Sequence, residues 1–293
     1  MSSQLQSAPA LALDRLSELR SELDRLDDAL LETLMRRADV VAQVGALGVK
    51  GNVPLRPGRE ASIIRRLLAR SRGALPPGAV VRIWRELINA FTAQQRPILI
   101  SVCEAEGGQQ FLSATREHFG ALTPVRPHRT PAQAIRDVSA GVATAAVLPL
   151  PAEGETPGAA WWTALLQRDD PRIHVVARLP FWAPRPEGAP QVHALVVSAA
   201  PPDPSGQDRS LLGLELPADG SRARLSAALA AAGFVVGPII LRRGPGTDAA
   251  HALVDVTGFV TDADPRLAAM QVILRPPVVL GAYAVPVGTE GGA

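Results

Sequence analysis

The sequence predicts a multidomain protein, with an all-α unit of three helices first, then an α/β region, then a βαββαβ unit. Three observations lead to this fold class. A long amphipathic pattern occupies residues 11–47, strands and helices alternate after Pro97, and the order strand, helix, strand, strand, helix, strand fills residues 211–285. A length of 293 residues suits two or three domains of ordinary size.

The first predicted element is one long helix over residues 11–47. Leucine and valine recur there at spacings of three, four and seven residues, between acidic residues and arginines. Two shorter helices follow, one from Pro57 to Gly73 and one from Val80 to Gln95, each with proline near its start. Because a helix of about 35 residues is roughly 50 Å long, two short partners cannot cover it. The excess apolar face predicts a homodimer through this helix.

The remaining elements alternate in type. Strands are predicted at residues 98–102 and 144–150 with helices at 109–118 and 131–139, which indicates an α/β region. The last six elements follow the ferredoxin-like order: strand 211–216, helix 221–232, strands 234–242 and 251–256, helix 264–270 and strand 278–285. We therefore expect domains at residues 11–97, 98–200 and 208–288, with a linker over 201–208.

Composition argues against several classes of protein. The formal charge is +2 and no run of five basic residues occurs, which argues against nucleic-acid binding. No stretch of about 18 apolar residues could span a membrane, and residues 1–10 lack the basic region of a secretory signal, so a cytoplasmic location is expected. The single Cys103 follows an apolar run and is expected to be a buried thiol, without disulfide or metal.

The cations of the helical unit suggest a shared pocket. Arg20 and Arg37 lie 17 residues apart, about 25 Å along one helix, so one chain cannot place both on one small ligand. In an antiparallel dimer of the long helices, Arg20 of one chain approaches Arg37 of the other. Dimerisation and ligand binding would then be one event.

Guanidinium groups bind carboxylates through two parallel hydrogen bonds. Arg37 and Arg59 could each take a carboxylate, while Glu60 accepts from a hydroxyl and Gln95 donates to an oxygen. The set indicates a pocket for a small dianion. For each residue alone a plainer interpretation exists: Arg37 beside Arg36 can belong to a solvated face, and Arg59 can pair with Glu60.

The ordered set resembles the all-helical class of chorismate mutases. The segments that carry the resemblance are Leu19–Asp27, Leu30–Arg37, Pro57–Glu60, Ile83–Arg85 and Gln95, within residues 13–96. The resemblance implies an intertwined homodimer of three-helix chains that binds chorismate, with no metal or cofactor. It implies substrate-binding roles for Arg20, Arg37, Arg59, Glu60 and Gln95, and catalytic roles for Lys50, Arg37 and Gln95.

The rearrangement of chorismate to prephenate is pericyclic, so catalysis is positioning plus electrostatics. A cation beside the breaking ether oxygen stabilises charge in the transition state. The family's lysine falls on Gly48 in this sequence, and Lys50, the only lysine in the chain, stands two residues later. Glycines at 48 and 51 weaken the helix, so Lys50 is expected to fold back toward the pocket. The alternative is a solvated loop lysine.

The C-terminal two thirds resemble other domains of the same pathway. Segments within residues 107–149 resemble the first lobe of prephenate dehydratases, and residues 208–283 resemble an ACT regulatory domain. Residues 150–191 are too few for a second lobe, and Val192-His193-Ala194 replaces the family's Thr-Arg-Phe, which indicates a degenerate dehydratase. His193 and His174 are interpreted as structural.

The resemblance to ACT domains implies an aromatic amino acid as effector. The turn at Asp219-Gly220 is where that family binds an amino acid, although Arg242-Arg243-Gly244 replaces the family's Ser-Arg-Pro. The leading hypothesis is a dimeric chorismate mutase in phenylalanine and tyrosine biosynthesis. The alternatives are a bifunctional chorismate mutase/prephenate dehydratase, and a non-catalytic regulator that binds an aromatic amino acid.

Overall fold

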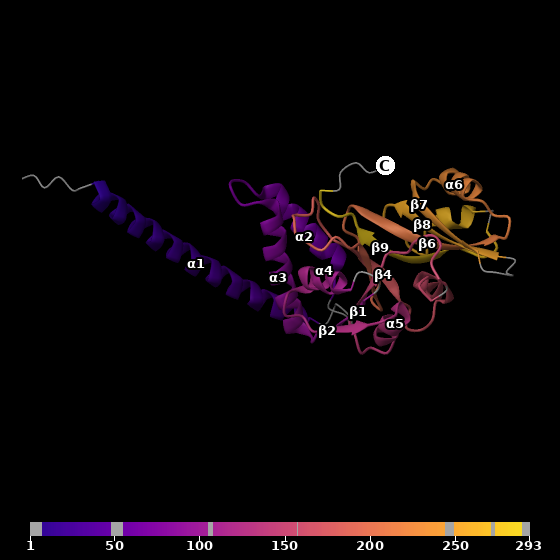
Figure 1. Ribbon diagram of the computed structural model, residues 1–293, viewed down its shortest axis with the longest axis horizontal. Helices are drawn as coiled ribbons and strands as arrows, with labels where there is room; N and C mark the ends of the chain where they lie inside the picture. The colour runs from indigo at the N-terminus through magenta and orange to yellow at the C-terminus, as the bar shows by residue number, and fades with distance from the viewer. Residues whose placement is uncertain are drawn as a thin grey trace, which may run out of the picture. The chain divides into compact units, whose positions relative to one another are not determined.

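The computed structural model describes residues 8–47, 55–104, 108–156, 158–243, 249–270 and 273–288. The chain divides into two compact units, Met1–Gly51 and Asn52–Ala293 (Figure 1). Within the described residues, no helix is both long enough and apolar enough to cross a membrane.

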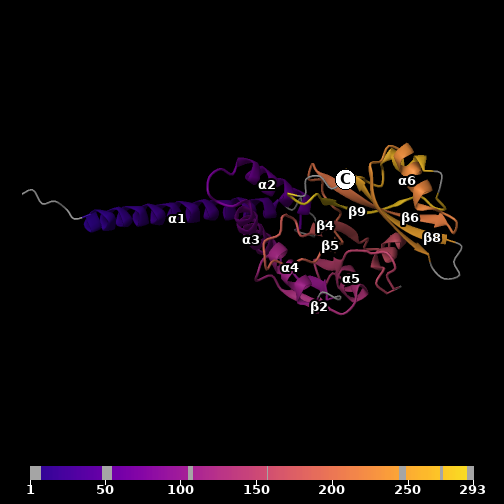
Figure 2. The same ribbon diagram turned by 45° about the horizontal axis from the view of Figure 1, so that its top comes forward.

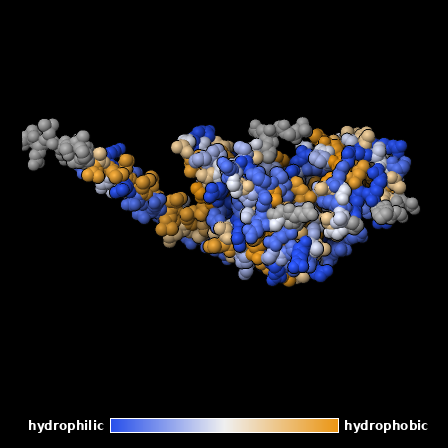
Figure 3. Space-filling view, viewed as in Figure 1, coloured by the Kyte–Doolittle hydropathy of each residue, from blue (hydrophilic) through white to orange (hydrophobic). Residues whose placement is uncertain are grey.

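The first unit consists of the long helix α1 (Ala8–Ala46), which confirms the prediction for residues 11–47. Its leucines and other large apolar residues are exposed along the length of the helix (Figure 3). Leu23, Leu26 and Leu30, for example, are 60%, 57% and 56% exposed. A soluble helix normally buries such a stripe, so α1 carries an apolar face that its own unit does not cover.

The second unit begins with helices α2 (Pro57–Arg70) and α3 (Pro77–Gln95), again as predicted. Each has proline at its first positions, where the missing N–H costs no helical hydrogen bond. Ala61 and Ile64 of α2 are fully buried in a cluster with Val81 and Ile88 of α3. Phe181 and Ala284, from later in the chain, belong to the same cluster.

A nine-stranded sheet forms the centre of the second unit, in the order β2-β1-β3-β5-β4-β9-β6-β8-β7. Its first part contains β1 (Ile100–Cys103), β2 (Val125–His128), β3 (Ala145–Pro149), β4 (His174–Leu179) and β5 (Ala194–Ser198). Strands β2, β1 and β3 are parallel, whereas β5 runs antiparallel to both β3 and β4. The predicted alternation of strands and helices is confirmed here, but the predicted strands did not include β2, β4 and β5.

Helices cover both faces of this first part. Helix α4 (Gln109–Phe119) buries Phe111 and Phe119 against one face, together with Ile100 and Val147 of the sheet. Helix α5 (Pro131–Ser139) packs on the other face, and the 3-10 helix η1 (Trp161–Gln167) joins the same cluster. Cys103 is buried in that cluster as a free thiol, as predicted.

The second part of the sheet has the predicted ferredoxin-like strand order. It contains β6 (Asp208–Pro217), α6 (Arg222–Ala231), β7 (Val236–Arg243), β8 (Ala249–Thr257), η2 (Pro265–Ala269) and β9 (Val278–Ala284). These strands lie in the order β9-β6-β8-β7 and are antiparallel throughout. The helix predicted at residues 264–270 is the short 3-10 helix η2. Figure 2 shows α6 and α5 on opposite sides of the strands.

One close backbone approach joins the two parts of the sheet. Strand β9 pairs in parallel with β4, with Gly281 opposite Val175. Gly281 has φ of +140°, and a Cβ on it would lie 2.1 Å from the carbonyl oxygen of Val175. Only glycine fits there without a shift of backbone. The sheet is therefore continuous across the predicted linker, while the predicted domain limits stay a prediction.

Candidate functional site

Helix α2 is capped by a residue far away in the sequence. Asp203 Oδ1 accepts a hydrogen bond from the N–H of Gly58, and Oδ2 accepts one from the N–H of Arg59, both at 3.0 Å. The first N–H groups of a helix lack partners within the helix, and its dipole favours a carboxylate there. Gly58 permits the approach, because a Cβ on it would lie 2.0 Å from the carbonyl oxygen of Asp203.

This arrangement leaves the side chain of Arg59 exposed at the start of α2. Within the part of the chain that the structure describes, no carboxylate forms an ion pair with Arg59. The plainer interpretation of Arg59, pairing with Glu60, is wrong, because Glu60 pairs with Arg85 instead. Arg59 is thus a solvent-accessible cation of the kind that the sequence predicts for binding a carboxylate.

Glu60 and Arg85 form a buried ion pair between α2 and α3. Arg85 Nη1 donates to Glu60 Oε2 at 2.7 Å, and the two side chains are only 5% and 10% exposed, respectively. Burial raises the pKa of the Glu60 carboxyl, while the Arg85 charge acts in the opposite direction. The Arg85 guanidinium also lies 4.6 Å from the ring centre of Phe181. Glu60 therefore holds the two helices together, and its predicted contact with a ligand hydroxyl stays a prediction.

The other predicted site residues lie on α1, at the end of α3 or outside the described residues. Gln95 is the last residue of α3 and is half-buried. Arg20 is exposed and Arg37 is half-buried, both on α1 in the first unit. Lys50 lies outside the described residues, as does Gly48. Glu60 and Arg59 are neighbours at the start of α2. Arg20 and Arg37 both lie on α1, but 17 residues separate them, about 25 Å along the helix, so they do not meet within one chain.

Two further predicted positions lie in the second unit. His174 on β4 is half-buried, and its pKa is lowered to about 4, first by burial and then by the positive charge of Arg172. His193 is exposed just before β5, and burial followed by the charges of Arg178 and Arg185 lowers its pKa. Within the described ranges, no group of three or more His, Cys, Asp or Glu side chains is placed to hold a metal ion.

Two arginine side chains contact the turn at Asp219-Gly220, which was predicted to bind an effector. Arg243 Nη2 donates to the carbonyl oxygen of Gly220 at 2.7 Å, and Arg224 forms an ion pair with Asp219 at 3.3 Å. Arg242 donates instead to the carbonyl oxygens of Glu155 and Thr156. Only Arg243 of this pair therefore contacts the turn, and the binding of an effector there stays a prediction.

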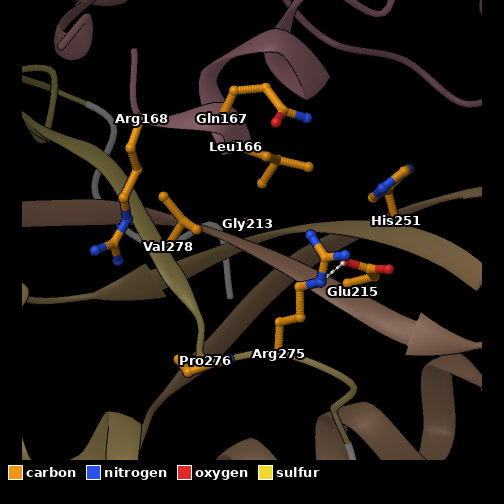
Figure 4. Close-up of a pocket in the computed structure, with 9 residues that line it drawn as sticks. All are labelled: Leu166, Gln167, Arg168, Gly213, Glu215, His251, Arg275, Pro276 and Val278. Atoms are coloured by element: carbon orange, nitrogen blue, oxygen red, sulfur yellow. Dashed lines mark ion pairs between the residues drawn. The ribbon is translucent and has the colours of Figure 1, made fainter. Parts of the chain in front are cut away.

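A cavity of about 380 Å³ lies between η1 and strands β6, β8 and β9. Figure 4 shows Glu215 and Arg275 pointing toward one another at its wall, with the Arg275 Nε 3.3 Å from Glu215 Oε2. Gly213 forms the floor, and a Cβ there would lie 2.3 Å from the side chain of Leu166. The sequence does not predict this cavity, because residues so far apart in the chain give no local pattern.

Comparison with known proteins assigns the helical region. Residues 19–96 match the family model of chorismate mutase type II. The chain is 32% identical over 139 residues to a bifunctional chorismate mutase/prephenate dehydratase of Aquifex aeolicus, covering 45% of this chain and 36% of the relative. It is 30% identical over 152 residues to the same kind of enzyme from Pseudomonas aeruginosa, covering 50% of this chain and 41% of the relative.

Two solved structures are similar to the C-terminal part. A protein described as a novel type of quorum quenching acylase matches 64% of this chain and 95% of its own, with 20% identity and a TM-score of 0.47. A prephenate dehydratase from Arthrobacter aurescens, in complex with L-Phe, matches 64% and 90%, with 16% identity and a TM-score of 0.46.

The chain spans less than half the length of the two curated relatives. The aligned regions are nevertheless longer than the region matched by the family model, so the similarity to bifunctional enzymes extends beyond the three helices. Arg20, Arg37, Arg59, Glu60 and Gln95 all fall inside the matched region. Residues 19–96 form a chorismate mutase type II domain, which is an isomerase domain.

Proposed function

We propose that this protein is a chorismate mutase that converts chorismate to prephenate. The observation that carries the proposal is the match of residues 19–96 to chorismate mutase type II, together with the arginines it contains at the predicted positions. Arg59 supports it further, since this exposed arginine has no carboxylate partner among the described residues.

The reaction breaks the ether C–O bond of chorismate and forms a C–C bond within the same molecule. No nucleophile, metal or proton transfer is needed, so the protein acts by selecting a folded conformer and stabilising developing charge. Arg37 and Arg59 hold the two carboxylates, while Arg20 arrives from the second subunit. Lys50 and Gln95 face the breaking ether, and Glu60 accepts from the substrate hydroxyl.

The exposed face of α1 supports the homodimer that this site requires. Burying a leucine side chain contributes about 1.5–3 kcal/mol, so the uncovered leucines of α1 favour pairing with a second copy. Replacing Leu26 and Leu30 together with aspartate would place charges on that face. We expect a dimer for the unmodified chain and a monomer for the double variant, measured by sedimentation equilibrium. A wild-type monomer at micromolar concentration would contradict the shared site.

The activity is tested by the consumption of chorismate with purified protein. Arg37→Ala and Arg59→Ala should each lower kcat/KM by about 100-fold or more, because each removes a carboxylate contact in a site that works by positioning. The matched controls are Arg36→Ala, next to Arg37 but paired with Glu32 on the exposed face, and Arg66→Ala on α2. Unchanged turnover in both site variants, with circular dichroism intact, rules the proposal out.

Lys50 requires its own variant. Lys50→Gln keeps a hydrogen-bond donor but removes the charge, so a cation beside the ether oxygen predicts a fall in kcat with little change in KM. Equal kcat in Lys50→Gln and the unmodified protein would make Lys50 a solvated lysine.

Prephenate dehydratase is the second candidate activity. The similarity to bifunctional enzymes beyond the helical domain favours it. Against it, β3, β4 and β5 are separated only by residues 150–173 and 180–193, which are too few for a second lobe. Formation of phenylpyruvate from prephenate by the purified chain tests it, and no product at high enzyme concentration dismisses it.

The third candidate is a non-catalytic regulator with an aromatic amino acid as effector. The ferredoxin-like strand order of the C-terminal part supports an ACT-like module. This candidate predicts no rearrangement of chorismate but a rise in Tm with phenylalanine. The cytoplasmic location stays a prediction that cell fractionation tests.

A further inference from the structure

A second cavity, of about 120 Å³, lies where the two parts of the sheet meet. Its walls are mostly apolar and include Leu211, Ile240 and Leu253, from strands β6, β7 and β8. Leu150, in the loop after β3, closes it from the other side. Arg242 on β7 holds this loop in place through the carbonyl oxygen of Glu155, at 3.2 Å. The cavity is thus built from both parts of the sheet.

Three polar side chains line one end of the cavity and are joined in a chain of hydrogen bonds. Arg178 on β4 donates to the hydroxyl of Tyr283 on β9 at 3.3 Å. That hydroxyl donates to Asp255 Oδ2 at 2.5 Å, and Arg209 Nε donates to Asp255 Oδ1 at 2.6 Å. Tyr283 is 2% exposed, so the network is fixed by packing as well as by hydrogen bonds.

The charges in this network do not balance. Asp255 is neutralised by Arg209, with which it forms an ion pair on the neighbouring strand. Arg178 is half-buried, and its hydroxyl contact with Tyr283 brings no negative charge. Among the described residues, no carboxylate lies within ion-pair distance of Arg178. A guanidinium in a partly buried site without a counter-charge is costly, and an anionic ligand would remove that cost.

We propose that this cavity binds a hydrophobic monocarboxylate, with Arg178 holding the carboxylate and the wall of Leu211, Ile240 and Leu253 holding the apolar group. A guanidinium matches a carboxylate through two parallel hydrogen bonds. An apolar protein cavity of about 150 Å³ accommodates benzene, so a cavity of this size takes a phenyl ring or a smaller branched chain. Tyr283 is a positioning residue that orients Arg178.

The same geometry selects against dianions. One uncompensated guanidinium neutralises one carboxylate, and a second carboxylate would meet either the apolar wall or Asp255. Like charges at close range disfavour binding by several kcal/mol. The proposed ligand therefore differs in class from a dicarboxylate such as chorismate, and this inference does not rest on the proposed mutase activity.

The test is isothermal titration calorimetry of the full chain with three probes. The first is 3-phenylpropionate, the second is 3-phenylpropan-1-ol, which lacks the carboxylate, and the third is phenylsuccinate, which has two. We expect saturable binding of 3-phenylpropionate, and affinity at least about 10-fold lower for the other two. Equal binding of the alcohol overturns the role of Arg178, and no binding of 3-phenylpropionate overturns the site, leaving a cavity that holds only water.

Variants locate the binding. Arg178→Gln should weaken 3-phenylpropionate by about 10-fold or more, and Ile240→Trp should abolish binding by filling the cavity. Arg224→Gln is the matched control, an exposed arginine in an ion pair outside the cavity. Undiminished binding in both cavity variants contradicts the proposal. Should either variant fail to fold, the three probes on the unmodified chain decide the question alone.

Discussion

Among single residues, the Glu60–Arg85 pair shows that a residue singled out by a motif can also have a structural role, beside the predicted one. Its carboxylate was predicted to reach a substrate hydroxyl, yet it is 10% exposed and bound to Arg85. Removing one partner of a buried pair leaves an uncompensated charge, which costs about 3–5 kcal/mol. The pair therefore ties α2 to α3 in the free protein.

A double-mutant cycle in urea measures this effect. Arg85→Met should lower the free energy of unfolding by about 3–5 kcal/mol, because Glu60 stays buried without a partner. The double variant Glu60→Leu, Arg85→Met should recover most of that loss, since both charges are gone. Single and double variants that are equally destabilised would show that packing against Phe181, rather than the charge pair, is what matters.

His174 makes the stability of the second unit depend on pH. Its pKa is about 4 in the folded chain, against 6.5 for an unperturbed histidine. The unfolded chain therefore binds more protons between these values, so the stabilisation present above pH 6.5 is lost as the pH falls toward 4.

Urea unfolding at a series of pH values checks this. His174→Gln should reduce the pH dependence of the free energy of unfolding between pH 6.5 and 4, to which buried His118 also contributes because burial lowers its pKa. His251→Gln on the neighbouring part of the sheet should retain the full dependence. An identical acid dependence in His174→Gln and the unmodified protein would exclude His174 as the cause.

Some residues could be predicted from their neighbours in the sequence, and others could not. Cys103 was predicted to be buried because apolar residues precede it, and it is. The hydrogen bond by which Asp203 caps α2 joins residues 145 positions apart, so nothing near Gly58 in the sequence predicts it. The hydrogen bonds that link Arg178, Tyr283 and Asp255 likewise join side chains from three different strands, so no local spacing in the sequence predicts them.

At the scale of elements, the start of α2 depends on one close contact. Gly58 lies under the backbone of Asp203, and any Cβ there would clash with backbone atoms, which cannot move as a side-chain end can. Gly58→Ala should therefore destabilise the second unit by about 1–3 kcal/mol, although alanine favours helices in general.

The matched control is Gly158→Ala, because a Cβ at Gly158 meets no atom within 4 Å. Thermal unfolding followed by circular dichroism at 222 nm should show a lower Tm for Gly58→Ala and a nearly unchanged Tm for Gly158→Ala. A Gly58→Ala variant as stable as the control would mean that the backbone around Asp203 moves away from the added Cβ at little cost in free energy.

The helices were easier to predict than the strands for a physical reason. Long periodic patterns identified α1, α2 and α3, since an apolar stripe over several turns has few other interpretations. Strand β2 has only four residues and contains Pro127, so it resembles a turn in sequence. The helix predicted at residues 264–270 is the 3-10 helix η2, and its five residues are too few to show a period that would define the type of helix.

Two features of the whole molecule, the exposed apolar face of α1 and the continuous nine-stranded sheet, differ in whether the sequence predicts them. The sequence predicts the first, because a helix of that length cannot be covered by two short ones. The pairing of β4 with β9, which joins the two parts of the sheet, depends on the fit at Gly281 and was not predicted. The apolar face of α1 predicts a homodimer. Because Arg20 and Arg37 of one chain are too far apart to hold one ligand, catalysis is predicted to require both chains.

Subunit complementation tests whether each mutase site takes arginines from two chains. Arg20→Ala and Arg37→Ala homodimers should each be inactive, because every site lacks one arginine. Equal amounts of the two, mixed after denaturation and refolded together, should recover about a quarter of the wild-type turnover of chorismate, since half the dimers are mixed and each mixed dimer has one complete site. Arg37→Ala mixed with Arg59→Ala, both from the same side of a site, should recover nothing. Turnover of the first mixture no higher than that of its inactive parents would contradict a mutase site shared between two subunits.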